Sequence, residues 1–79
     1  MLSELRSGKK VVGAKQSRRA IREGLARQVF LACDAAPGLT APLLRLCRQK
    51  SVPVSTDRTM RELGQAAGIQ VGASVVTLL

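Results

Sequence analysis

The sequence predicts an α/β fold, a three-layer α/β/α sandwich around a four-stranded mixed sheet. Short β-branched runs alternate with helical stretches along the chain, and glycine or proline stands at most of the boundaries between them. Residues 72–79, "GASVVTLL", form a continuous apolar run that suits a strand covered on both faces. A length of 79 residues allows a single domain, spanning 1–79, with one small core.

The first half of the chain is expected to hold two strands and one long helix. An opening turn capped by Ser3 precedes a short strand at residues 9–12, "KKVV". A helix follows at residues 15–23 and ends before Gly24, because glycine suits the left-handed position after a helix. The run "RQVFLAC" at residues 27–33 is β-branched and aromatic, so it predicts the second strand.

The middle of the chain predicts a loop, a helix and a peripheral strand. Pro37 and Gly38 are strong turn residues, so the helix is expected to begin after them, with Thr40 as its cap, and to run to about Lys50. Residues 52–55, "VPVS", predict a short strand. Proline has no N–H to donate to a sheet, so this strand is expected at an edge.

The last helix has the clearest start and stop signals. Thr59 and Glu62 have the spacing of a capping box, in which each side chain bonds the other's backbone N–H. The stripe expected to be buried consists of Met60, Leu63, Gly64 and Ala67. Gly68 closes the helix, and residues 72–79 then form the final strand.

The charge balance indicates a polyanionic partner. Thirteen lysines and arginines against five acids give a net charge of +8. A small domain this basic usually meets nucleic acid. An anionic membrane surface is the competing partner, and a charge that merely keeps the protein soluble is the plainest alternative.

Other functional classes lack their residues. The chain has no histidine, and Cys33 and Cys47 are too few for a disulfide framework and wrongly spaced for zinc, so no metal or other cofactor is expected. Both thiols are expected to be reduced, without a disulfide partner, and buried as small hydrophobes. No acid–base pair, activated nucleophile or phosphate-binding P-loop is present, which argues against an enzyme. Residues 1–10 lack the apolar region of a signal peptide and no run is long enough for a membrane span, so we expect a cytoplasmic protein.

One helix concentrates the positive charge on a single face. Four cations lie at i, i+3, i+4 and i+7 of the predicted helix: Lys15, Arg18, Arg19 and Arg22. The opposite side carries Ser17, Ala20 and Ile21. Like charges one turn apart repel by a few tenths of a kcal/mol per pair. Only Glu23 offers relief, by pairing with Arg19 or Arg27, so folding alone does not account for the stripe.

The start of the same helix is suited to bind an anion. Gly13 permits close approach of a ligand, and the first N–H groups after it, from Ala14 onward, are unpaired donors at the positive end of the helix dipole. Lys15 and Gln16 place hydrogen-bonding side chains there. Gln16 can read a base edge with a donor and an acceptor, and the arginines can reach phosphates or guanine. Single-strand binders stack bases on several exposed aromatic rings, but this chain has only Phe30, which is expected in the core. Recognition of folded RNA is therefore favoured.

The segments "VVGAKQSRRAIREG", "LACDAAPGLT", "LLRLCRQKSVPV" and "MRELGQAAGIQVGASVV" together resemble the small ribosomal-protein family that binds kink-turn RNA, in particular its short bacterial members. The resemblance covers roughly residues 9–79 in order and spacing. It implies a three-layer α/β/α sandwich. It also implies binding to a duplex bent sharply at a three-nucleotide bulge beside tandem sheared G·A pairs, as part of a ribonucleoprotein.

The resemblance also implies specific contact residues. The family's turn "G-x-N-E-x-x-K" places Gly13 at the glycine, Lys15 at the asparagine, Gln16 at the glutamate and Arg19 at the lysine. Lys15 and Gln16 depart from the archaeal and eukaryotic pattern and suit the bacterial variant. Arg18 and Arg22 are expected to contact the RNA because they belong to the same charged face of the helix, not because the family motif includes them.

A second implied contact is the loop after the last helix. Ile69 and Val71 would touch an extruded base, and Gln70 its edge. Ile69 competes for another role, because the residue after a helix-ending glycine often buries against the helix. Asp34 matches an acidic position near the RNA, although an acid beside a turn also caps backbone N–H groups.

Three functions remain open from the sequence. The first is a kink-turn RNA binder, in the ribosome or on another structured RNA. The second is a protein-interaction adaptor of the same fold, whose basic face meets an acidic partner. The third is a ribosome-peripheral factor with weak, general affinity for RNA.

Overall fold

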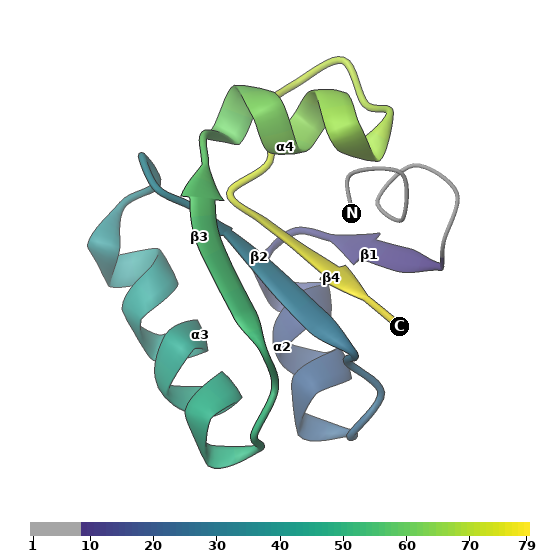
Figure 1. Cartoon of the computed structure of the whole chain (residues 1–79), viewed down its shortest axis with the longest axis vertical. Helices are drawn as coiled ribbons and strands as arrows, with labels where there is room; N and C mark the ends of the chain where they lie inside the picture. The colour runs from purple at the N-terminus through teal and green to yellow at the C-terminus, as the bar shows by residue number, and fades with distance from the viewer. Residues whose placement is uncertain (1–8) are drawn as a thin grey trace.

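The computed structural model describes residues 9–79, so the opening turn predicted at Ser3 lies outside the described part of the chain. Strands and helices alternate along these residues as predicted (Figure 1). The elements are β1 (Lys10–Val12), α2 (Ala14–Arg22), β2 (Gln28–Ala32), α3 (Pro37–Gln49), β3 (Val54–Arg58), α4 (Met60–Ala67) and β4 (Val75–Leu78).

The strands form one mixed sheet in the order β1-β4-β2-β3. β4 runs antiparallel to both β1 and β2, whereas β2 and β3 are parallel. Residues paired across neighbouring strands show which strand ends lie together: Val12 with Val76, Leu31 with Val75, and Ala32 with Arg58. The carboxyl ends of β1, β2 and β3 and the start of β4 therefore share one edge of the sheet, and the loops that leave these ends gather there.

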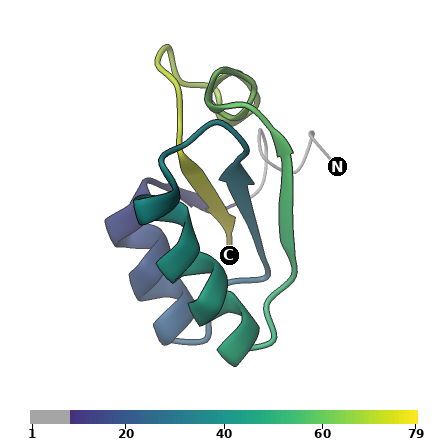
Figure 2. The same cartoon turned by 90° about the vertical axis from the view of Figure 1, so that its left-hand side faces the viewer.

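Helices cover both faces of this sheet, which confirms the predicted three layers. Side chains alternate along β2: Val29 and Leu31 join the cluster under α2 and α3, while Phe30 and Ala32 join the cluster under α4. Figure 2 shows α2 and α3 side by side on one face of the sheet. Helix α4 is viewed nearly along its own axis and lies at one end of the sheet. Phe30 is 5% exposed, so its predicted place in the core is confirmed.

Helix α3 begins earlier than the sequence analysis expected. Pro37 and Gly38 were predicted to form a loop before Thr40, but Pro37 occupies the first turn of the helix and Ala36 precedes it without a side-chain cap. Proline suits this position, because its fixed φ is helical and the missing N–H has no helical partner there. Pro42 then lies inside the helix.

The third strand lies at an edge, as expected, but it spans Val54–Arg58 rather than residues 52–55. Pro53 stands just before it and accepts the N–H of Val29 through its carbonyl oxygen at 3.0 Å. Beyond the predicted end, the strand continues through Thr56, Asp57 and Arg58, of which only Thr56 is β-branched. This mainly polar stretch lacks the β-branched run that was used to predict the other strands.

The two cysteines differ in their surroundings, and the prediction that both are buried is wrong for Cys33. Cys47 is fully buried against the sheet, and burial raises the pKa of its thiol. Cys33 is exposed, because it follows the last residue of β2 and turns away with the loop. Both are free thiols in the structure.

Within residues 9–79, none of the helices has the length and apolar character that crossing a bilayer requires. The same residues hold no group of three or more His, Cys, Asp or Glu side chains arranged to bind a metal ion.

Candidate RNA interface

The outer face of α2 carries the predicted basic stripe. Lys15, Gln16, Arg18, Arg19 and Arg22 are all exposed, and together with Glu23 they line one surface hollow. Ser17, Ala20 and Ile21 are buried on the opposite side. The small side chains there let α2 pack closely on the sheet, while the long cationic side chains remain in solvent.

The start of α2 offers open hydrogen-bond donors. Gly13 caps the helix with φ 106° and ψ 156°, a conformation that essentially only glycine adopts, and it offers no side-chain cap to the first turn. A Cβ added at Gly13 would meet nothing within 4 Å, so a ligand has room to approach the backbone. The N–H of Gly13 donates to Val75 O at 2.9 Å, which anchors the turn to β4.

Few of the α2 cations are neutralised within the described part of the chain. Arg19 Nε donates to Glu23 Oε2 at 3.2 Å, as expected, but the Arg19 side chain is 81% exposed, so this pair contributes only about 0.3–0.5 kcal/mol. Among residues 9–79, no carboxylate pairs with Lys15, Arg18 or Arg22. The first turn of α2 also lacks an acidic residue. This surface therefore presents a positive potential that an anion would relieve.

The second predicted contact is the loop between α4 and β4. Gly68 takes the left-handed conformation, and the N–H of Ile69 donates to Gly64 O at 3.0 Å, which closes the helix. Ile69 is half-buried and packs against the core, so it fills the helix-capping role that the sequence left open. Gln70 and Val71 are exposed, and Val71 shows 71% of its surface to solvent.

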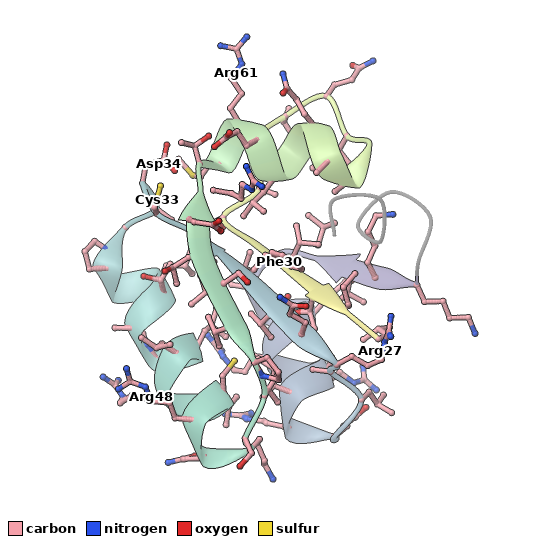
Figure 3. All side chains as sticks on the ribbon, in the orientation of Figure 1. Arg27, Phe30, Cys33, Asp34, Arg48 and Arg61 are labelled. Carbon is pink, nitrogen blue, oxygen red and sulfur yellow. The ribbon has the colours of Figure 1, made fainter. Side chains whose placement is uncertain are left out.

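Asp34 has a structural partner. Its Oδ1 accepts the backbone N–H of Met60 at 2.8 Å, so the carboxylate caps the start of α4 from the β2–α3 loop. This bond corresponds to the capping role considered from the sequence, while a contact between Asp34 and RNA stays a prediction. Asp34 and Cys33 lie together beside the start of α4 (Figure 3).

Two further polar residues, which the sequence pattern did not single out, lie beside this loop. One hollow is lined by Asp34, Met60, Arg61, Gln65, Ile69, Gln70, Val71 and Gly72. Arg61 and Gln65 stand one turn apart on the exposed side of α4, and Figure 3 shows Arg61 pointing away from the helix. The only signal in the sequence was their exposed, polar character near the predicted loop.

Gly64 determines how the loop sits on α4. It is buried, and a Cβ added there would collide with the carbonyl oxygen of Val71. The N–H of Ala73 donates to Met60 O at 2.9 Å, which fastens the other end of the loop to the same helix. The exposed side chains of Gln70 and Val71 therefore stand on a backbone that is held closely against α4.

The sheet brings the two predicted contact regions to one edge. Gly13 to Gln16 follow β1, Asp34 follows β2, and Ile69 to Val71 precede β4, all at the edge described above. The hollow on α2 and the hollow beside α4 share no lining residue. The start of α2 and the α4–β4 loop thus lie at the same end of the sheet, in two separate hollows, and the hollow on α2 extends away from that end along the helix to Glu23.

The sequence also matches a known family over nearly its full length. The model of the Ribosomal protein L7Ae/L30e/S12e/Gadd45 family matches residues 2–79. The chain belongs to this family. An RNA-binding protein of Geobacillus sp. (strain WCH70) is 41% identical over 75 residues, which cover 95% of this chain and 92% of that protein. The RNA-binding protein YbxF of Geobacillus stearothermophilus is 40% identical over 75 residues, with the same coverage of 95% and 92%.

Solved structures show the same fold. The Giardia lamblia 15.5kD RNA binding protein superposes with a TM-score of 0.90 at 26% identity, covering 98% of this chain and 68% of that one. A protein of unknown function from Bacillus halodurans gives a TM-score of 0.89, also at 26% identity, and covers 98% of this chain and 81% of that one.

Proposed function

We propose that this chain is an RNA-binding protein that recognises and stabilises kink-turn RNA. The observation that carries the proposal is the exposed basic face of α2. The first turn of this helix contains no acidic residue, and Gly13 gives it no side-chain cap. Membership of a family whose relatives are named RNA-binding proteins supports RNA as the polyanion. Exposed Gln70 and Val71 at the same edge of the sheet support a second contact beside the first.

The chemistry of each contact follows from its residue type. The planar guanidinium groups of the arginines on α2 can donate hydrogen bonds to phosphate oxygens. Gln16 suits a base edge that needs both a donor and an acceptor. The apolar atoms of Val71 suit the face of an unstacked base. A bent RNA brings two phosphate backbones and a splayed base close together, so it can occupy both hollows at once.

The proposed action is selection of a conformation. A protein that binds the bent RNA more tightly than the straight form shifts the population toward the bent form by that difference in affinity. Cations on α2 lower the repulsion between the approaching backbones, and this contribution weakens with added salt. The proposed role is binding without catalysis, carried out in the cytoplasm on ribosomal or other structured RNA.

A titration against two RNAs tests the proposal. One RNA contains a kink-turn and the other is a straight duplex of equal length, and both are titrated at low and at physiological salt. Preference for the kink-turn at both salt concentrations supports the proposal. Equal affinity for both RNAs, falling steeply with salt, would indicate a general RNA binder, and no binding to either would favour a protein partner.

Two α2 variants test the site itself. Gln16→Ala and Arg19→Ala are each expected to weaken kink-turn binding by about 1–2 kcal/mol, roughly five- to thirtyfold, because each removes a directed hydrogen-bonding group. Arg48→Ala is the matched control, because Arg48 is an exposed arginine on α3 that does not line either hollow. If Gln16→Ala and Arg19→Ala bind like Arg48→Ala, the assignment of the site to the start of α2 is wrong.

A further inference from the structure

A third hollow lies between α2 and α3, on the side of these helices away from the sheet. It is lined by Arg18, Arg22, Pro42, Arg45, Leu46 and Gln49. Helices α2 and α3 lie side by side over the same face of the sheet (Figure 2), so the hollow is a groove between them. The resemblance to kink-turn binders points to the start of α2 and the α4–β4 loop, and it does not account for this groove.

The groove follows from the helical spacing of its residues. Pro42, Arg45, Leu46 and Gln49 stand at i, i+3, i+4 and i+7 on α3, and Arg18 and Arg22 stand one turn apart on α2. Each helix buries its other side, with Leu43 and Cys47 of α3 packed against the sheet. The walls of the groove are therefore held in place by the core, while its arginines are exposed.

The groove is lined by positively charged side chains that form no ion pair within the described residues. Neither α2 nor α3 contains an acidic residue. Within residues 9–79, no carboxylate pairs with Arg18, Arg22 or Arg45. Three guanidinium groups line one groove and repel one another, so an anion bound between the helices would relieve that repulsion.

The groove is continuous with the proposed RNA site. Arg18 and Arg22 line both this groove and the hollow on α2. The stripe from Lys15 to Arg22 rises about 10 Å along the helix, so its cations can contact successive phosphates of one strand. A backbone that leaves the start of α2 can therefore pass along α2 into the groove, where planar guanidinium groups from both helices face its oxygens.

We propose that the groove between α2 and α3 binds the phosphate backbone of one arm of the same RNA whose bend docks at the start of α2. This inference rests on the proposed function, because it assigns the path of that RNA beyond the bend. Arg45 is its distinguishing residue, since it belongs to the groove and not to the hollow on α2. A phosphate contact positions the arm and carries no base specificity.

The test compares Arg45→Gln with Arg48→Gln. Both remove one positive charge from the exposed surface of α3, but Arg48 does not line the groove and points outward from α3 (Figure 3). Each variant is titrated with a kink-turn RNA that has long arms and with the same RNA trimmed close to the bend. Thermal unfolding of both variants checks that the fold is unchanged.

With the long-armed RNA, Arg45→Gln is expected to bind about fivefold more weakly and to lower the dependence of log K on log salt by roughly one unit. Arg48→Gln is expected to stay within about twofold of the parent, because its exposed charge is largely screened. With the trimmed RNA, Arg45→Gln should bind like the parent. Equal losses in the two variants, or a loss at Arg45 that persists on the trimmed RNA, overturn the inference.

The same titrations separate this inference from the proposed function. If the parent protein does not prefer the kink-turn over a straight duplex, the proposed function fails, whatever Arg45 does. If the parent prefers the kink-turn and Arg45→Gln behaves like Arg48→Gln, the function stands and the groove does not hold the arm. Poly-glutamate serves as a probe for an acidic protein. If Arg45→Gln weakens the binding of poly-glutamate and leaves RNA binding unchanged, the groove belongs to an acidic protein and the inference is overturned.

Discussion

The layer formed by α2 and α3 and the end of the molecule around α4 use their charged side chains differently. Seven cations stand on or just after α2 and α3, with Glu23 as the one acid beside them: Lys15, Arg18, Arg19, Arg22, Arg45, Arg48 and Lys50. Around α4, by contrast, two acids have hydrogen-bond partners. Asp34 accepts the N–H of Met60, and Glu62 accepts the N–H of Thr59 at 2.9 Å.

This difference separates charges that stabilise the fold from charges that are free to bind. At α4 the Thr59 hydroxyl accepts the N–H of Glu62 at 3.2 Å, which completes the capping box, and Arg58 lies 4.0 Å from Glu62. On α2 the ion pair between Arg19 and Glu23 is exposed. Cations that stand one turn apart on this helix repel one another. Substitution of the hydrogen-bonded acids at α4 should therefore change stability, whereas substitution of the exposed cations on α2 should chiefly change RNA binding.

The largest effect is expected from Gly64→Ala. Alanine would favour the helix by about 1 kcal/mol over glycine. The added Cβ, however, meets the carbonyl oxygen of Val71, and the backbone cannot rotate away as a side chain can. Forcing the loop off α4 costs about 1–3 kcal/mol or more. We expect a net loss of unfolding free energy in urea denaturation, together with weaker RNA binding as Gln70 and Val71 move.

Gly38→Ala is the matched control for Gly64→Ala. Gly38 lies in the first turn of α3, and an added Cβ there meets nothing within 4 Å. The same substitution should raise stability by about 0.4–1 kcal/mol, because it restricts the unfolded chain. If both alanine variants are more stable than the parent, the tight contact between α4 and its loop is not a determinant of the fold.

A smaller effect is expected from Glu62→Gln, and it should depend on pH. Hydrogen bonding, chiefly from the backbone N–H of Thr59, lowers the pKa of Glu62 below its ordinary value. A lowered folded-state pKa means that the stabilisation is complete above the ordinary glutamate range and is lost as the pH falls through the folded value. The parent should therefore exceed the variant in stability near neutral pH, and the two should converge in acid. Thermal melts across this range measure the difference, and a gap that is constant down to low pH would contradict the assignment.

The smallest effect on stability is expected from Lys15→Gln. This substitution should raise the stability of the fold and lower the affinity for RNA. Lys15 is a cation in the first turn of α2, where the helix dipole disfavours positive charge, and it stands one turn before Arg19. Its removal should stabilise the fold by about 0.3–0.5 kcal/mol while weakening the affinity for RNA. Arg22→Gln is the control, because Arg22 lies in the last turn, where the dipole favours it. A loss of stability in Lys15→Gln would show that the stripe serves the fold.

Local sequence patterns predicted what depends on neighbours in the chain. The capping box of Thr59 and Glu62, the closing Gly68 and the basic stripe of α2 follow from residues within two turns of each other, and the structure confirms them. The alternation along β2 that buries Phe30 is likewise local. The errors at Pro37 and Cys33 arose where one residue type fits two structures: proline suits a turn or a helix start, and cysteine suits a core or an exposed turn.

Patterns in the amino-acid sequence were enough to predict the fold class and the helix that carries the charge, and they suggested candidate RNA contacts on α2 and in the α4–β4 loop. The position of Gly13, Asp34 and Val71 at one edge of the sheet depends on the tertiary structure, because sheet order depends on pairings between strands far apart in the chain. The same holds for the groove, in which Arg18 and Arg45 meet only because α2 and α3 pack side by side. Helical periodicity places a side chain on one face of its own helix, but the packing of the core determines which helix that face meets.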